Sequence, residues 1–197
     1  MTPETKKIDP RAARTRILIQ DAFLSLTREK VFEAITVKDI VERANINRST
    51  FYAHFEDKYI LLDQLLSEAF SSGISSKFQS DVQLNEDTLK TLIVAMCSYH
   101  ENISNHCNMV YKSISSYMDN KTQLKLKELI ALMLTNTTSF GVIEQENLDL
   151  LSIMISNSIY GATSYWYSKG RHVSAKELSH NILPYVMPSI EMFTSRR

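Results

Sequence analysis

Glycine and proline are scarce in this sequence of 197 residues, with only four of each. All-β folds need many tight turns, which are rich in these two residues, so the scarcity argues against an all-β protein. No apolar stretch approaches the roughly 18 residues that a membrane-spanning helix needs. The N-terminal stretch MTPETKKIDPRAARTR also lacks the apolar core of an export signal. These absences predict a cytoplasmic protein that does not cross a membrane.

Cysteine and net charge are also low. In the cytoplasm the two cysteines, Cys97 and Cys107, would be reduced thiols rather than a disulfide. The 22 basic residues balance the 22 acidic ones, whereas a nucleic-acid-binding protein usually has a basic excess. Any DNA-binding surface must therefore be a local concentration of positive charge. The N-terminal segment holds such a concentration: Lys6, Lys7, Arg11, Arg14 and Arg16.

Apolar residues recur three and four positions apart through almost the whole chain, which is typical of amphipathic helices. A first helix is expected over residues 10–30, with Ile19, Ala22, Phe23 and Leu26 on its buried face. No stretch long enough to form a strand alternates apolar and polar residues, and no internal repeat is found. The sequence therefore predicts an all-α fold.

Longer helices are expected behind the N-terminal ones. A helix over residues 57–80 contains Ser71-Ser72-Gly73, which favours a bend or an early end. The further helices are expected around residues 89–100, over 105–118, 122–140 and 147–169, and from Ser174 onward. The predicted domains are residues 1–60 for DNA binding and residues 61–197 for regulation and dimerisation.

The stretch TVKDIVERANINRSTFYAHFEDK has the form of a helix-turn-helix. Its first segment begins with Thr36 and Asp39, spaced as in a capping box, and a two-residue break at Asn45-Ile46 follows. A second helix would then start with Asn47 as its N-cap. Two short helices joined by such a turn form the unit whose second helix enters the DNA major groove.

The second helix would have one apolar side and one side rich in hydrogen-bond donors. Phe51 and Phe55, four residues apart, can both point inward. Arginine can bond guanine bidentately, while serine and threonine reach bases or phosphates. We therefore predict base contacts from the outward positions Arg48, Ser49, Thr50 and Tyr52.

The run ITVKDIVERANINRSTFYAHFEDKYILL resembles the N-terminal DNA-binding domain of the TetR family of bacterial transcription regulators. Phe51-Tyr52, His54-Phe55, Lys58 and Leu61-Leu62 all lie in register with that family's pattern. Two glycines of the pattern are missing, one at Asn45 in the turn and one near Lys30-Val31. Asparagine tolerates the left-handed conformation better than other non-glycine residues, so we expect the turn to survive.

The resemblance also implies contacts to the DNA backbone. Carried over position by position, it assigns phosphate contacts to Thr36, Asn47, Tyr52, His54 and Lys58. No serine, cysteine or carboxylate is placed by a motif to make His54 a catalytic base. Since no nucleophile–base or metalloprotease motif occurs elsewhere, the protein is not expected to be an enzyme.

The helix expected over residues 147–169 carries apolar residues on nearly every face, which requires cover on most sides. In a chain of this size a partner subunit is the economical cover. The final helix contains Pro184 and Pro188, which should kink or split it. With their symmetry mates, these two helices are expected to form a four-helix interface in a homodimer, as the resemblance also implies.

Methionines and aromatic residues suggest a soft interior in the second half, where the resemblance implies an effector pocket. Ordinary core packing explains these residues equally well. The candidate pocket residues are Met96, Tyr99, His100, Met109, Tyr117, Met133 and Trp166.

A competing site is the group Cys97, His100, His106 and Cys107, because thiolates and imidazoles bind zinc and copper. Cys97 and His100 are three residues apart and can share a helix face. The group matches no familiar zinc spacing, so no metal and no cofactor is predicted. A metal- or redox-sensing regulator nevertheless remains an alternative.

The sequence thus predicts a dimeric transcriptional repressor that binds double-stranded DNA at a palindromic operator and is released by a small-molecule effector. The helix from Asp57 would carry the change between the two halves of the chain. Besides the metal- or redox-sensing regulator, the alternative is a helical small-molecule-binding protein with no role on DNA.

Overall fold

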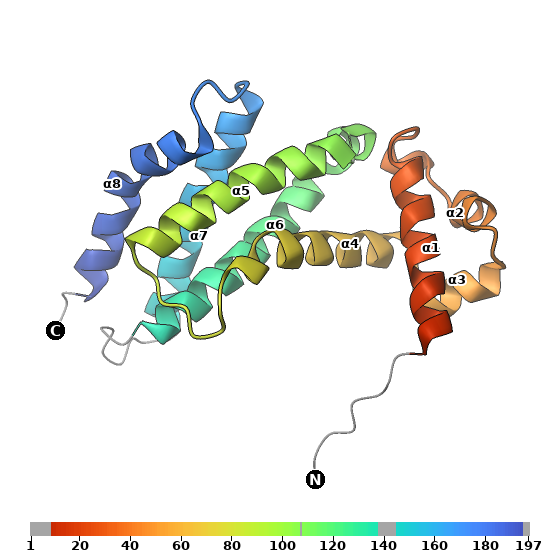
Figure 1. The fold of residues 1–197 in the computed structure, drawn as a ribbon, viewed down its shortest axis with the longest axis horizontal. Helices are drawn as coiled ribbons and strands as arrows, with labels where there is room; N and C mark the ends of the chain where they lie inside the picture. Colours follow the sequence, from red (N-terminus) through yellow and green to blue (C-terminus); the bar gives the residue numbers. More distant parts are fainter. Residues whose placement is uncertain (1–8, 107, 138–144, 195–197) are drawn as a thin grey trace, which may run out of the picture. The chain divides into compact units, whose positions relative to one another are not determined.

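The structure, a computed structural model, describes residues 9–106, 108–137 and 145–194. These residues form eight α-helices and two short 3-10 helices, with no strand among them (Figure 1). This confirms the predicted all-α class for the described part of the chain. The chain divides into two compact units: unit 1 is Met1–Leu65 with His106–Ser115, and unit 2 is Leu66–Asn105 with Ser116–Arg197.

Helix α1 (Pro10–Leu26) opens unit 1. Asp9 caps it by accepting a hydrogen bond from the Arg11 amide at 2.9 Å, and Pro10 occupies a first-turn position where its missing N–H has no cost. The helix ends at Leu26, earlier than the predicted residue 30. The hydroxyl of Thr27 donates back to the Leu24 carbonyl at 2.7 Å, and residues 27–30 form a turn.

Helices α2 (Val37–Ala44) and α3 (Arg48–His54) form the predicted helix-turn-helix. Thr36 and Asp39 make the predicted capping box at the start of α2. Between the helices, Asn45 adopts the left-handed conformation with φ 52°, so asparagine does take the place that glycine has in the family pattern.

Phenylalanines hold the three helices together in unit 1. Phe51 and Phe55 of the α3 segment are 0% and 1% exposed, which confirms that both point inward. Phe32, in the 3-10 helix η1 (Phe32–Ala34), is also buried and meets the Phe23 ring edge-on at 6.3 Å. Burying an aromatic side chain of this size stabilises by about 1.5–3 kcal/mol, so the phenylalanines position α3 firmly.

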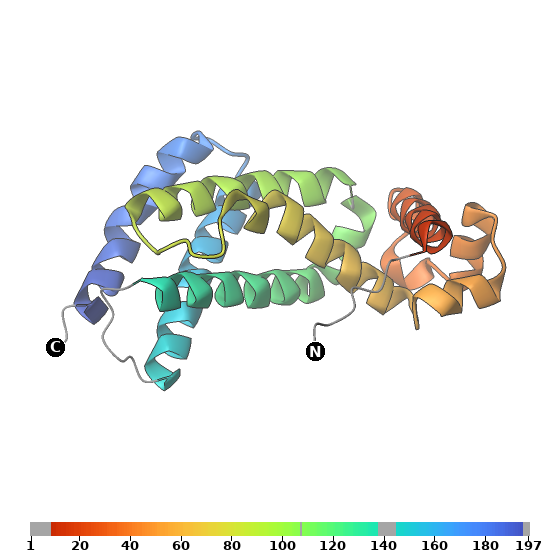
Figure 2. The same cartoon turned by 60° about the horizontal axis from the view of Figure 1, so that its bottom comes forward.

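Helix α4 (Lys58–Gly73) contains residues of both units and ends at Gly73, which confirms the expected early end. The 3-10 helix η2 (Ser75–Lys77) follows it. The long helices α5 (Glu86–His106) and α6 (Asn108–Asn136) belong mostly to unit 2, and their residues 106–115 belong to unit 1 (Figure 2).

Two helical segments are present here, as predicted, but they meet at a kink at Ile114 within α6, with φ −130° and ψ 30°, rather than near residues 119–121. The second segment runs through the polar stretch around Asp119. Tertiary contacts override the local preference for a loop, because Asp119 accepts a hydrogen bond from the Tyr160 hydroxyl at 2.5 Å. Thr122 also bonds back to the Met118 carbonyl at 2.9 Å.

Helices α5 to α8 enclose the apolar core of unit 2. Leu92, Ile93 and Met96 on α5 are fully buried, as the spacing predicted, and Ile130 on α6 and Ile159 on α7 join them. No helix in the described ranges combines the length and the apolar character that crossing a membrane would require.

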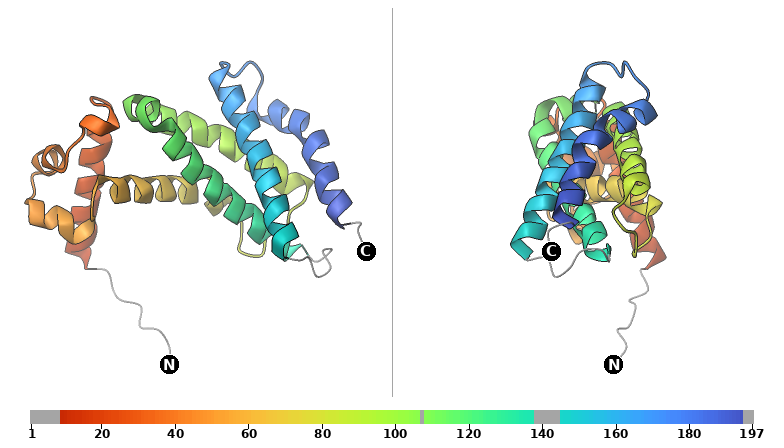
Figure 3. Two further views of the ribbon diagram at one scale, coloured as in Figure 1. Left: turned by 180° about the vertical axis from the view of Figure 1, so that it is seen from behind. Right: turned by 90° about the vertical axis from the view of Figure 1, so that its left-hand side faces the viewer.

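Helices α7 (Gln145–Ser168) and α8 (Ala175–Thr194) pack side by side (Figure 3). As predicted, Gly170 terminates α7, with φ +84° and hydrogen bonds that close the helix end. Of the two expected effects of proline, a split does not occur, since α8 runs through both Pro184 and Pro188, and the kink stays a prediction. Both prolines lie on the exposed side, where water can satisfy the carbonyl groups that they leave without a partner.

Candidate DNA-binding surface

The exposed face of α3 carries the predicted donors. Arg48, Ser49 and Tyr52 are exposed, and Thr50 is half-buried. The opposite face carries the buried rings of Phe51 and Phe55, which form a phenylalanine bed beneath the helix. The structure therefore gathers all four predicted base-contacting side chains on one short helix whose underside is fixed in the core.

Arg48 and Tyr52 contact each other on this face. Nη2 of Arg48 donates to the Tyr52 hydroxyl oxygen at 3.2 Å, and the guanidinium carbon lies 5.6 Å from the centre of the Tyr52 ring. The Tyr52 ring in turn meets the Phe51 ring edge-on, with 5.5 Å between ring centres. The guanidinium is thus tied through Tyr52 to the core of unit 1.

Asn47 and His54 lie at the two ends of α3. Asn47 occupies the predicted N-cap position, but its side chain makes no capping hydrogen bond. The exposed amide can therefore donate elsewhere. His54 is half-buried, and its ring lies 6.3 Å from the Phe55 ring.

Thr36 uses its hydroxyl inside the capping box. The oxygen accepts from the Asp39 amide at 3.1 Å, and the hydroxyl donates to Oδ2 of Asp39 at 2.8 Å. The backbone N–H of Thr36 also goes to this carboxylate, at 2.8 Å. Since a hydroxyl has one proton, the geometry leaves none for a phosphate.

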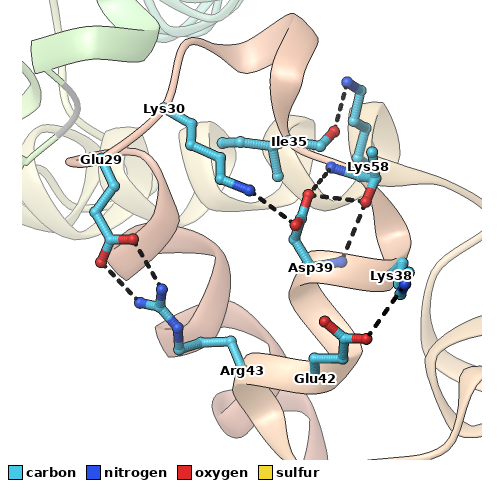
Figure 4. A network of polar contacts seen from close by, with 9 residues as sticks. Glu29, Lys30, Ile35, Lys38, Asp39, Glu42, Arg43 and Lys58 are labelled. Carbon is cyan, nitrogen blue, oxygen red and sulfur yellow. Dashed lines mark hydrogen bonds and ion pairs between the residues drawn. The ribbon is translucent and has the colours of Figure 1, made fainter.

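The carboxylate of Asp39 is the centre of a small polar network (Figure 4). Lys30 donates to its Oδ1 at 2.8 Å, and this bond together with those from Thr36 lowers the pKa of Asp39 well below its usual range. On the same side of unit 1, Arg43 of α2 makes a bidentate pair with Glu29 at 2.8 and 2.9 Å (Figure 4). These contacts fasten the turn after α1 to α2.

Lys58, a predicted phosphate contact, has its ammonium at the end of η1. Its ammonium donates to the carbonyls of Phe32 and Ile35 at 2.8 Å and of Glu33 at 3.3 Å, and it lies 4.5 Å from the centre of the Phe32 ring. Partial burial lowers the pKa of Lys58. An ammonium has three N–H groups, so all of them are engaged in closing the end of η1 rather than offered to a phosphate.

The sequence assigns Arg16 of α1 no role beyond its place in the basic N-terminal segment. In the structure its guanidinium carbon lies 5.4 Å from the ring centre of Phe55, the residue that ends α3. This contact joins residues far apart in the chain, so no local pattern predicts it. Lys6 and Lys7 lie outside the described residues.

The predicted pocket residues do not form one group. Met96, Tyr99 and Met133 are buried in the core of unit 2. Trp166 is buried apart from that core and donates to the Val173 carbonyl at 2.8 Å, while Tyr117 is only half-buried, beneath the Lys121 ammonium. The side chain of Met109 lies outside the description.

The polar groups of this interior are bonded to each other. Nε2 of His100 lies 3.1 Å from the Thr163 hydroxyl, and the Tyr99 hydroxyl lies 3.1 Å from that of Thr122. A groove of about 370 Å³ on unit 2 is bordered by other residues, among them Phe70 and Lys125. None of the seven predicted pocket residues borders this groove.

The predicted cysteine–histidine group is only partly described. Cys97 is buried, which raises the pKa of its thiol to about 12, and His100 is bonded to Thr163. Within the described ranges, no three histidine, cysteine or acidic side chains lie close enough together to hold a metal ion. Cys107 and the side chain of His106 lie outside those ranges.

Two short helices at a tight turn, with donors on the second and an apolar bed beneath it, define a helix-turn-helix protein. The particular family that this part of the chain matches is TetR. The family model described as "Bacterial regulatory proteins, tetR family" matches residues 19–65, which include the whole helix-turn-helix.

Relatives and solved structures extend this assignment. The chain is 42% identical over 65 residues to the uncharacterized HTH-type transcriptional regulator YxbF of Bacillus subtilis (strain 168), covering 32% of this chain and 17% of that protein. This chain therefore spans only a small part of YxbF. It is 23% identical over 191 residues to the HTH-type transcriptional repressor KstR2 of Rhodococcus jostii (strain RHA1), covering 90% of each.

The fold is similar to the crystal structure of a TetR transcriptional regulator from Streptococcus agalactiae 2603V. The TM-score is 0.64 at 22% identity, covering 89% of this chain and 95% of that one. The similarity in fold thus covers most of the chain. The matched family model and the relatives named here are described as transcriptional regulators.

Proposed function

We propose that this protein is a dimeric, cytoplasmic transcriptional repressor that binds a palindromic DNA operator. The observation that carries the proposal is the exposed donor face of α3 above a buried phenylalanine bed. This is the arrangement that presents a helix to the major groove. Residues 1–60 would form the DNA-binding domain and residues 61–197 the regulatory and dimerisation domain.

On DNA, base edges would be contacted by Arg48, Ser49, Thr50 and Tyr52. Phosphates would be contacted by Asn47, His54 and the Tyr52 hydroxyl. Thr36 and Lys58 would instead support the fold, because their donors are already used within unit 1.

Dimerisation would occur through α7 and α8. Apolar side chains lie exposed on these two helices: Leu150, Ile153, Met154, Tyr165, Tyr185 and Met192. Between Asp149 and Lys169, α7 carries no charged residue. An uncharged apolar face suits a twofold interface, because residues close to the axis lie near their own copies, where charges of one sign would repel.

The dimer would hold two copies of α3 about one DNA turn apart, near 34–36 Å, or a multiple of that distance. A small-molecule effector that binds better to a dimer with another spacing would lower operator affinity by the ratio of its two affinities. Helix α4, which contains residues of both units, would carry this change.

The test is selection of bound fragments from the source genome with the purified full-length protein. We expect enrichment of one inverted repeat and an affinity that falls steeply with salt, because phosphate contacts release counterions. A protein that dimerises yet enriches no genomic sequence would overturn the proposal.

A further inference from the structure

Arg48 and Tyr52 form a pair on the exposed face of α3. They are one helical turn apart, joined by the hydrogen bond of 3.2 Å and by the guanidinium lying over the ring. Behind Tyr52, the Phe51 ring is fully buried and meets it nearly at right angles, at 87°. The long Arg48 side chain is therefore held at its tip as well as at its backbone.

The pairing leaves both side chains with unused hydrogen-bonding groups. A guanidinium has five N–H donors, so one bond to Tyr52 leaves enough for the two bonds that arginine makes to guanine O6 and N7. A tyrosine hydroxyl that accepts a bond from arginine keeps its own proton. That proton is available to a phosphate oxygen, the acceptor most often contacted by side chains on DNA.

We propose that Tyr52 is a positioning residue for Arg48. Its hydroxyl accepts from the Arg48 guanidinium and donates to a backbone phosphate, so the phosphate that Tyr52 binds sets the orientation in which Arg48 meets its base. The inference rests on the proposed function and goes beyond it, because it makes the two residues one recognition unit rather than two independent contacts.

The test compares Arg48→Ala, Tyr52→Phe and the double variant of the full-length protein. Binding is measured to the selected operator and to operators with each base pair of a half-site changed in turn. Tyr52→Phe keeps the ring and removes only the hydroxyl. Tyr59→Phe is the matched control, since Tyr59 is also 47% exposed but lies on α4.

Arg48→Ala is expected to reduce discrimination at one base position by about 10- to 100-fold. Tyr52→Phe is expected to reduce discrimination at the same position, by about 3- to 10-fold. The double variant should discriminate there no worse than Arg48→Ala alone, because the hydroxyl acts through the guanidinium. Tyr59→Phe should match the unmodified protein.

The inference is overturned if Tyr52→Phe weakens binding to every operator equally and leaves base preference intact. It is also overturned if the two losses of discrimination multiply in the double variant. Tyr52 is 47% exposed and Tyr52→Phe removes only its hydroxyl, so thermal unfolding should stay unchanged and exclude misfolding as the cause. If the unmodified protein selects no operator, the proposed function fails, which is a different result from either of these.

Discussion

Two polar residues that the resemblance associates with DNA use their donors within the fold in this structure. Lys58 lies in register with the family pattern, yet its ammonium closes the carbonyl end of η1. The Thr36 hydroxyl likewise donates its proton to the Asp39 carboxylate. Spacing along the chain indicates which residues lie near the DNA-binding helix. Only the hydrogen bonds that their donors make within the protein show which of these residues remain available to bind DNA.

Replacing Lys58 by methionine tests its structural role. The change keeps most of the side-chain length and removes the donors to the Phe32 and Ile35 carbonyls. We expect a loss of about 1–3 kcal/mol in the free energy of unfolding, because part-buried carbonyls lose their partners. Urea unfolding followed by circular dichroism measures it.

Lys38→Met is the control, since Lys38 is exposed and pairs only with Glu42, at 3.8 Å. Its effect should stay within about 0.5 kcal/mol. If Lys58→Met instead leaves the stability unchanged and weakens binding to all DNA sequences alike, Lys58 contacts phosphate, as the resemblance implies.

Between elements, the contact of α5 with α7 includes a polar group inside an apolar core. His100 of α5 is 5% exposed, bonded to Thr163 of α7 and 5.2 Å from the Tyr160 ring. Burial lowers the pKa of His100 from 6.5 to about 4. The imidazole is therefore neutral near pH 7, and helix packing depends on its staying so.

Unit 2 should consequently be less stable in mild acid. Above pH 6.5 both the folded and the unfolded states hold His100 neutral; as the pH falls toward 4, only the unfolded state takes up the proton. We expect the free energy of unfolding to be lower at pH 5 than at pH 7 by about 2 kcal/mol from this residue. Urea unfolding at the two pH values measures the difference.

His100→Gln should lack this part of the pH dependence, whereas His172→Gln, which changes an exposed histidine, should retain it. An equal dependence in His100→Gln and the unmodified protein would mean that His100 is not the group responsible.

At the scale of the whole molecule, the apolar face of α7 and α8 has no cover within the described chain. Met154 lies on it and is 50% exposed. Residues on this face contribute nothing evident to unit 2 itself, whose core lies on the opposite side of both helices. A second copy is the cover proposed above.

Met154→Glu should therefore yield monomers, because each subunit would have to bury an unpaired carboxylate in the apolar interface. Sedimentation velocity at micromolar concentration measures the oligomeric state, and operator affinity should fall with it. Leu124→Glu adds the same charge at a residue of α6 that is 51% exposed and should stay dimeric. A dimeric Met154→Glu protein would place the interface elsewhere.

Features that depend on neighbours in sequence were predicted well. They include the capping box at Thr36, the left-handed turn at Asn45, the inward phenylalanines of α3, the end of α4 at Gly73 and the stop at Gly170. Each rests on backbone preferences or side-chain spacing within one or two helical turns.

The sequence by itself determined the all-α class, the helix-turn-helix and the donor-rich face of α3, because local periodicity and capping carry that information. Only the tertiary structure decided that α6 continues past Asp119 and that Lys58 and Thr36 are engaged within unit 1. The same holds for the separation of Trp166 from the core around Met96. In each case a partner distant in the chain, or a choice among competing acceptors, outweighs the local preference, and such competition is settled only when the helices pack.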